Sequence, residues 1–128
     1  MLRVKQGVLL SVVAIFAAVL KKDQIVSITA NKTVNKSGAD AIAVGRVLVP
    51  PTVINGEGTI EVFYRELHDI KTTTNIAAGD FFKMAAADGT TGENRIAKWV
   101  SGTDAEELKC GICWSGGSAN GTVSVFFR

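Results

Sequence analysis

The sequence predicts a mainly β protein: a small β-sandwich or barrel of the β-tulip type, built from two related halves, with an apolar N-terminal arm or helix. Three observations carry this prediction: short segments of alternating apolar and polar residues, glycine- and asparagine-rich turns between them, and an internal repeat. The length of 128 residues fits one domain, and the hydrophobic content of 47% is that of a globular chain. The net charge of +2 is too small for nucleic-acid binding as the main activity.

The N-terminal segment is an apolar run, residues 7–20, followed by Lys21 and Lys22. It is shorter than the roughly 20 residues of a membrane-spanning helix, and no small-residue cleavage site follows it. We therefore expect residues 1–22 to form an arm, or a helix over 9–21, that packs against this chain or a neighbouring subunit and not in a membrane. The side chains expected to contact a partner there are Val8, Leu9, Leu10, Val12, Val13, Ile15 and Phe16.

Residues 23–128 are expected to form a single β domain. Within residues 59–65, Ile60 and Val62 alternate with polar residues, which is typical of a half-buried strand. Glycine-rich stretches separate the strand candidates, because glycine and asparagine tolerate the positive φ of tight turns. In chain order, the strand candidates are residues 24–29, 41–49, 59–65, 80–85, 95–100, 108–114 and 122–127.

The clearest long-range pattern is an internal repeat. Residues 37–41 (SGADA) match residues 101–105 (SGTDA), and residues 58–65 (GTIEVFYR) match residues 121–128 (GTVSVFFR). Two matches in the same order and at nearly the same separation predict a duplicated unit. The repeated units are expected to cover approximately residues 37–65 and 101–128.

The chain lacks residues that would converge on a reaction. We expect the lone histidine, His68, at a surface turn and Glu61 on a solvated strand face beside Arg65. Cys110 and Cys113 supply only two of the four ligands that structural zinc takes, and their side chains diverge on a strand, so we expect unbridged, buried thiols. No serine-nucleophile motif or phosphate-binding glycine loop occurs. The sequence therefore predicts no enzyme, no cofactor and no metal site.

Consecutive aromatic residues indicate a second apolar face. Neighbouring side chains on a strand point to opposite faces, so Phe81 and Phe82 cannot both enter one core, and neither can Phe126 and Phe127. One of each pair then faces a partner, as in a homo-oligomer, unless a two-layer fold covers both faces itself. The aromatic residues expected to contact a partner are Phe63, Phe82 and Phe126.

A pattern in the C-terminal half combines residues 99–105 (WVSGTDA), 110–112 (CGI) and 122–127 (TVSVFF), preceded by residues 78–85 (AGDFFKMA). Over residues 77–128 this pattern resembles the head decoration, or capsid cement, proteins of lambda-type tailed phages. The resemblance implies a β-rich fold without a cofactor, usually trimeric, that binds the major capsid protein on the outside of the expanded shell and stabilises it. The location that it implies is the virion surface.

An alternative function is a secreted or surface-anchored β-sandwich module of the adhesion or pilus type. In that case residues 2–20 would act as an export signal or a retained anchor.

Overall fold

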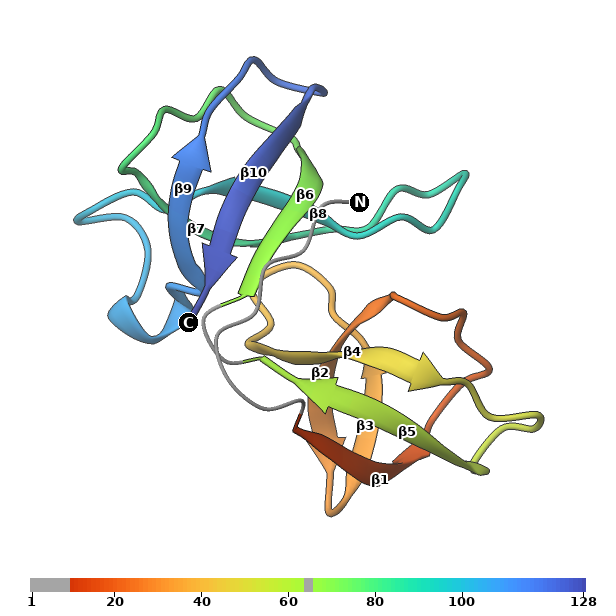
Figure 1. The fold of residues 1–128 in the computed structure, drawn as a ribbon. Coiled ribbons are helices and arrows are strands. Elements are labelled where there is room, and N and C mark those ends of the chain that lie inside the picture. The colour runs from red at the N-terminus through yellow and green to blue at the C-terminus, as the bar shows by residue number, and fades with distance from the viewer. Residues whose placement is uncertain (1–9, 64–65) are drawn as a thin grey trace.

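The structure, a computed structural model, describes residues 10–63 and 66–128 and is mainly β, which confirms the predicted fold class (Figure 1). The described strands form two closed five-stranded barrels that follow each other along the chain. Barrel 1 consists of β1 (Ser11–Phe16), β2 (Ile25–Ala30), β3 (Thr33–Lys36), β4 (Ala43–Val49) and β5 (Glu57–Val62). Barrel 2 consists of β6 (Glu66–Thr72), β7 (Phe81–Ala85), β8 (Arg95–Lys98), β9 (Gly111–Ser115) and β10 (Thr122–Phe127), with a 3-10 turn, η1 (Glu106–Leu108), before β9.

The two barrels have the same strand order and the same pairing directions. Barrel 1 runs β1-β3-β2-β4-β5, and barrel 2 runs β6-β8-β7-β9-β10 around its closed sheet. In each barrel the first and third strands pair in parallel, and the other pairs are antiparallel. The match extends to single residues, since Val26 lies opposite Gly45 as Phe82 lies opposite Gly111. The fold is therefore a duplicated barrel.

The turns that close the last hairpin of each barrel also repeat. Asn55 and Asn120 have positive φ angles of 61° and 68°, a conformation that asparagine adopts more readily than most residues. Their amides donate hydrogen bonds of 2.8 and 2.7 Å to the carbonyl of the last residue of β1 and of β6, respectively. The structure thus aligns Gly56 with Gly121. This is two residues away from the sequence match, which aligned Gly58 with Gly121, and a shift of two keeps every side chain on the same face.

Each barrel encloses its own apolar core. In barrel 1, Phe16, Val26 and Val47 have exposed fractions of 0%, as have Phe82 and Val125 in barrel 2. These side chains face inward from three strands of barrel 1 and two of barrel 2, so each barrel has a core of packed apolar side chains.

Barrel 1 also closes one end of barrel 2. Ile25, on the outer face of β2, and Phe63, directly after β5, belong to the core of barrel 2. The ring of Phe63 stacks on that of Phe127 with 4.4 Å between centroids. Asn94, before β8, accepts a 2.8 Å hydrogen bond from the amide of Ile25 and donates one of 3.4 Å to its carbonyl. The two barrels are therefore joined through both apolar and polar contacts.

The N-terminal segment forms a barrel strand over Ser11–Phe16, which corrects the expectation of an arm or a helix there. β1 pairs with β5 from Ser11 opposite Glu61 to Ile15 opposite Glu57, and Phe16 is fully buried. The run lacks an alternating pattern because the outward positions of β1 are also apolar. No helix among the described residues is long and apolar enough to cross a membrane.

Candidate partner-binding surfaces

The residues predicted to contact a partner divide into exposed and buried groups. Val8 and Leu9 lie outside the described residues. The exposed residues are Leu10, Val12, Val13 and Ile15, and Phe126 is half-buried. Three residues, with exposed fractions of 0%, 7% and 0%, are instead core residues, which corrects their assignment to a partner surface: Phe16, Phe63 and Phe82.

The consecutive aromatics do point to opposite faces, as their position on a strand requires. In β7, Phe82 enters the core while Phe81 is 41% exposed, and in β10, Phe127 enters the core while Phe126 lies on the outer face. The alternation was predictable from the sequence, but which member points inward was not, because both members of each pair are phenylalanine. Phe81, and not Phe82, is therefore the β7 residue available to a partner.

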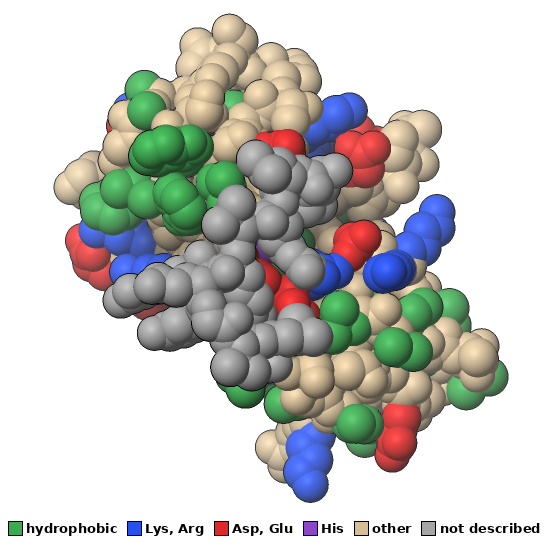
Figure 2. Space-filling model, viewed as in Figure 1, with side chains coloured by type: hydrophobic (Ala, Val, Ile, Leu, Met, Phe, Trp, Pro, Cys, Tyr) green, Lys and Arg blue, Asp and Glu red, His purple; other side chains and the backbone are tan. Residues whose placement is uncertain are grey.

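An apolar patch covers the outer face of β7, β9 and β10, and Figure 2 shows hydrophobic side chains gathered on this side of barrel 2. Phe81 lies opposite Ile112 on the adjacent strand, and Ile112 lies opposite Phe126. The rings of Trp114 and Phe126 meet with 5.7 Å between centroids. Ile112 and Trp114 are 39% and 63% exposed. We call these four residues the barrel 2 patch; contiguous exposed apolar side chains of this kind mark contact surfaces.

One edge of the barrel 2 patch is held in place by a lysine. The ammonium of Lys109 lies 4.2 Å from the ring centroid of Phe81 and 4.1 Å from that of Trp99. It also forms a 2.9 Å ion pair with Glu106. A cation over two rings restrains them, so Phe81 is presented in a fixed orientation.

Barrel 1 has an open hollow of about 590 Å³. Its lining includes Val44, Ile60 and Val62, which are buried or half-buried, and Val12 and Ile28, which are exposed. Val12 and Ile28 are 44% and 66% exposed although both point toward the barrel interior, because this end of the barrel is not covered by the described residues. We call this feature the barrel 1 hollow. Ile28 was not predicted as a partner residue, because the sequence of β2 is typical of an ordinary half-buried strand.

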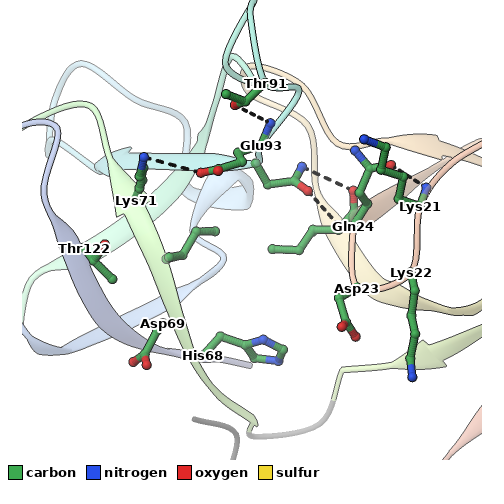
Figure 3. A pocket seen from close by; sticks show the side chains of 13 residues that line it. Lys21, Lys22, Asp23, Gln24, His68, Asp69, Lys71, Thr91, Glu93 and Thr122 are labelled. Atoms are coloured by element: carbon green, nitrogen blue, oxygen red, sulfur yellow. Dashed lines mark hydrogen bonds and ion pairs between the residues drawn. The ribbon is translucent and has the colours of Figure 1, made fainter. Parts of the chain in front are cut away.

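A polar cleft of about 470 Å³ lies between the barrels (Figure 3). Lys71 and Glu93 form an ion pair across part of it at 3.6 Å, and Gln24 reaches from barrel 1 to the carbonyl of Gly92. Charges of both signs line the cleft, so it presents no single-sign surface to an ionic ligand. The other labelled lining residues are Lys21, Lys22, Asp23, His68, Asp69, Thr91 and Thr122.

His68 is not at a surface turn, contrary to the sequence expectation. It is 1% exposed within β6, where its Nε2 lies 3.3 Å from Oε2 of Glu66 and its ring meets two phenylalanine rings edge-on at 5.1 and 5.4 Å. The neighbouring Asp69 lies on the opposite face of the strand, where its carboxylate accepts a 2.6 Å hydrogen bond from the hydroxyl of Ser124. Because β6 contains several charged residues, its sequence does not show that most of its side chains are buried.

Glu61 is fully buried and not solvated, which corrects a second expectation. Its Oε1 accepts a 2.9 Å hydrogen bond from Nε of Arg46 on the adjacent strand, and Arg46 also pairs with Asp23. Removing one member of a buried ion pair typically costs about 3–5 kcal/mol because the remaining charge is left uncompensated. This cluster is therefore part of the framework that holds β4 and β5 together.

Cys110 and Cys113 are free and buried in the core of barrel 2. Burial raises the pKa of both thiols, so they stay protonated at neutral pH and are poor nucleophiles. Among residues 10–63 and 66–128, no three histidine, cysteine or acidic side chains are grouped so that they could hold a metal ion. The surfaces described above are suited to contact with another macromolecule.

No protein-family model matches the chain, and no curated protein is similar to it in sequence. Among solved structures, the chain is similar to the N base of the head fiber gp8.5 in bacteriophage phi29, with a TM-score of 0.51 and 12% sequence identity. The likeness covers 94% of this chain and 95% of that chain. At this identity the likeness concerns the fold, and its extent includes both barrels. The duplicated barrel is thus a fold that this chain shares, over nearly its whole length, with the base of a phage head fiber.

Proposed function

We propose that this chain is a structural protein of a tailed-phage virion that binds the major capsid protein on the outer surface of the head, as a decoration or cement protein. The observation that carries this proposal is the likeness of both barrels, end to end, to the phi29 head fiber base. The sequence pattern over residues 77–128, which resembles head decoration proteins, supports the same role independently.

The distribution of apolar side chains on the surface also favours a structural role. The barrel 2 patch and the barrel 1 hollow lie on different barrels, so one copy offers apolar contacts at two places. A protein repeated many times on a symmetric shell needs only a modest interface per copy, because the contacts of all copies add together.

The surface proposed to face the shell is the end of barrel 1 that lies away from barrel 2 (Figure 1). Val53 and Ile54, in the β4–β5 loop, are 60% and 64% exposed, and Ile15 on β1 is 37% exposed. The amide of Asn55 donates a 2.8 Å hydrogen bond to the carbonyl of Phe16, which fixes the loop to the end of β1. Ile15 is one of the residues predicted from the sequence to contact a partner.

In the alternative, a secreted or surface-anchored adhesion or pilus-like module, residues 2–20 would be an export signal or a retained anchor. The position of β1 argues against a cleaved signal. Cleavage there would remove β1 and the buried ring of Phe16 from barrel 1. The virion role requires no such loss.

The proposal is tested by sedimenting the purified chain with expanded heads assembled from the major capsid protein of the phage whose genome encodes the chain. We expect the wild type to pellet with the heads and saturate at a fixed number of copies per shell. Ile54→Lys places a charge in the proposed shell contact and should weaken binding by at least about tenfold, since a buried anchor commonly contributes 2 kcal/mol or more.

The matched control is Ser118→Lys, which adds the same charge at an exposed turn of barrel 2. It should bind like the wild type. A wild-type chain that stays in the supernatant at all concentrations rules out the proposed function, and equal binding by Ile54→Lys rules out the proposed shell-facing surface.

A further inference from the structure

The barrel 1 hollow occupies the place that, in the duplicated fold, corresponds to the filled end of barrel 2. Strand pairing and the equivalent hydrogen bonds after β5 and β10 match the residues around the hollow to core residues of barrel 2. All of these barrel 2 residues are at most 5% exposed. The matched pairs are Val12 with His68, Ile28 with Met84, Val44 with Cys110, Ile60 with Val125, and Val62 with Phe127.

Barrel 2 is filled at this end by side chains that come from outside it. Ile25 and Phe63, both from the barrel 1 half, join its core, and Asn94 binds both backbone polar groups of Ile25. Docking of one barrel on the open end of another is thus already present within the chain.

Among residues 10–63 and 66–128, only barrel 1 residues line the hollow, so no described side chain from outside the barrel takes the place that Phe63 has in barrel 2. Phe63 lies three residues before Glu66, which pairs with Phe127. Leu10 is in the matching position of barrel 1, because its carbonyl accepts a 2.8 Å hydrogen bond from the amide of Val62. Three residues before Leu10 in the sequence is Gly7, a residue without a side chain.

The residue equivalent to Ile25 in barrel 2 is Phe81. Ile25 lies opposite Arg46 between β2 and β4, as Phe81 lies opposite Ile112 between β7 and β9. Phe81 is 41% exposed and belongs to the barrel 2 patch. Arg46 and Ile112 are thus equivalent residues. Arg46 is charged and buried, whereas Ile112 is apolar and exposed.

We propose that the barrel 1 hollow binds the barrel 2 patch of a second copy of this chain, with Phe81 entering the hollow. The contact would reproduce between chains the docking of Ile25 on barrel 2 within one chain. Lys32 is equivalent to Asn94 and stands at the hollow, where its ammonium can donate hydrogen bonds to backbone carbonyls around Phe81. Because the two surfaces differ, the contact is head-to-tail and builds a closed ring or an open chain of copies.

The inference is tested on the isolated protein, without capsids, so its result is separate from that of the proposed function. Sedimentation velocity over a concentration series should show wild-type species larger than a monomer. Ile28→Lys charges the hollow and Phe81→Lys charges the patch; each should weaken self-association by at least about tenfold. Both side chains are exposed, and matching thermal melts would show that the variants are folded.

The sharpest test is to mix the two variants. Ile28→Lys keeps an intact patch, and Phe81→Lys keeps an intact hollow, so a head-to-tail contact predicts a heterodimer that grows no further. If the hollow instead contacted the hollow of a second copy, or the patch contacted the patch, mixing the two variants would form no such heterodimer.

The matched control is Val19→Lys, at an exposed position of barrel 1 that does not line the hollow, which should self-associate like the wild type. A wild-type chain that is monomeric at every concentration, or a mixture that forms no heterodimer, overturns the inference. In the first case the hollow accepts a different occupant, such as residues 1–9 or a capsid segment.

Discussion

Two glycines show how closely the halves of the molecule correspond at single residues. A Cβ at Gly45 would collide with the carbonyl oxygen of Glu61, and one at Gly111 would collide with that of Phe126. Both glycines lie in the fourth strand of their barrel, and both collisions involve the matching residue of the fifth strand. The fourth and fifth strands therefore approach each other equally closely in both barrels.

Lys83 links the two halves by charge. Its ammonium lies 2.7 Å from Asp104 in its own barrel and 3.1 Å from Asp40 in barrel 1. The hydrogen bond from Lys83 lowers the pKa of Asp104, and the hydrogen bonds to Asp104 and Asp40 raise the pKa of Lys83. The bridge therefore stabilises the folded state when Asp104 is ionised and Lys83 is protonated.

This bridge predicts a pH-dependent stability difference between the wild type and Lys83→Met. A lowered carboxyl pKa contributes stability that is present above the ordinary value of 3.8 and is lost as the pH falls through the folded value. A raised lysine pKa contributes stability that is present below 10.5 and is lost as the pH rises through the folded value. Urea unfolding should give Lys83→Met a lower midpoint at pH 7, and the gap should close at both extremes of pH.

Lys22→Met, which removes a charge from an exposed position, is the control for net charge and should show a smaller gap at pH 7. A gap between the wild type and Lys83→Met that stays constant from about pH 2 to about pH 7, an interval that includes the range over which carboxyl groups titrate, would contradict the role of Asp104.

At the scale of elements, substitutions in β1 test whether residues 11–16 are a strand of barrel 1 or an arm outside it. Phe16 is fully buried in barrel 1, whereas Ile15, its neighbour on β1, is 37% exposed. Phe16→Ala should lower the free energy of unfolding by about 3–5 kcal/mol, the usual cost of such a truncation in a core. Ile15→Ala should cost less than about 1 kcal/mol, as exposed substitutions do.

Chemical denaturation followed by circular dichroism measures both values. Equal, small effects of the two substitutions would mean that residues 11–16 do not belong to the barrel, as expected for an arm.

The sequence predicted strands such as β7 and β10, in which buried side chains alternate with more exposed ones. Residues 122–127 coincide with β10, and residues 80–85 and 41–49 differ from β7 and β4 by only one or two residues at one end. The turn before β10 was also predicted correctly, because the dipeptide Asn120-Gly121 strongly favours a positive φ.

The strands that were missed break the alternating pattern for physical reasons. β1 is apolar on both faces, so it reads as an arm or a helix. β6 carries Glu66, His68 and Asp69, of which Glu66 and His68 are buried, so a covered strand reads as a polar loop. β3 spans only Thr33–Lys36 and is too short for a pattern to emerge. β1 and β6 are the equivalent first strands of the two barrels. Because neither was predicted, only the later part of each repeated unit was detected from the sequence.

The exposure of the predicted partner residues was correct in part, and their contact with a partner stays a prediction. The outward-facing residues of β1 and Phe126 in the barrel 2 patch were named from the sequence, and they are exposed or half-buried. Phe81 and Ile28 were not named, because their availability depends on which face of a strand the barrel closes over. Which face is turned inward depends on the strands packed opposite, and a local sequence pattern does not contain that information.

At the scale of the whole molecule, duplication explains why apolar surface remains in two places. Barrel 1 covers the open end of barrel 2, but within the described residues no third barrel covers the hollow of barrel 1 or the outer patch of barrel 2. A chain of two such units is expected to satisfy both surfaces by assembly, which suits a protein displayed in many copies on a symmetric particle.

The most direct test of the proposed virion role is a cryo-electron microscopy reconstruction of heads isolated with and without this chain. We predict added density on the outer surface of the shell that fits the duplicated barrel, with the β4–β5 loop of barrel 1 against the capsid protein. Identical reconstructions of the two samples, or added density only inside the shell, would contradict the proposed function.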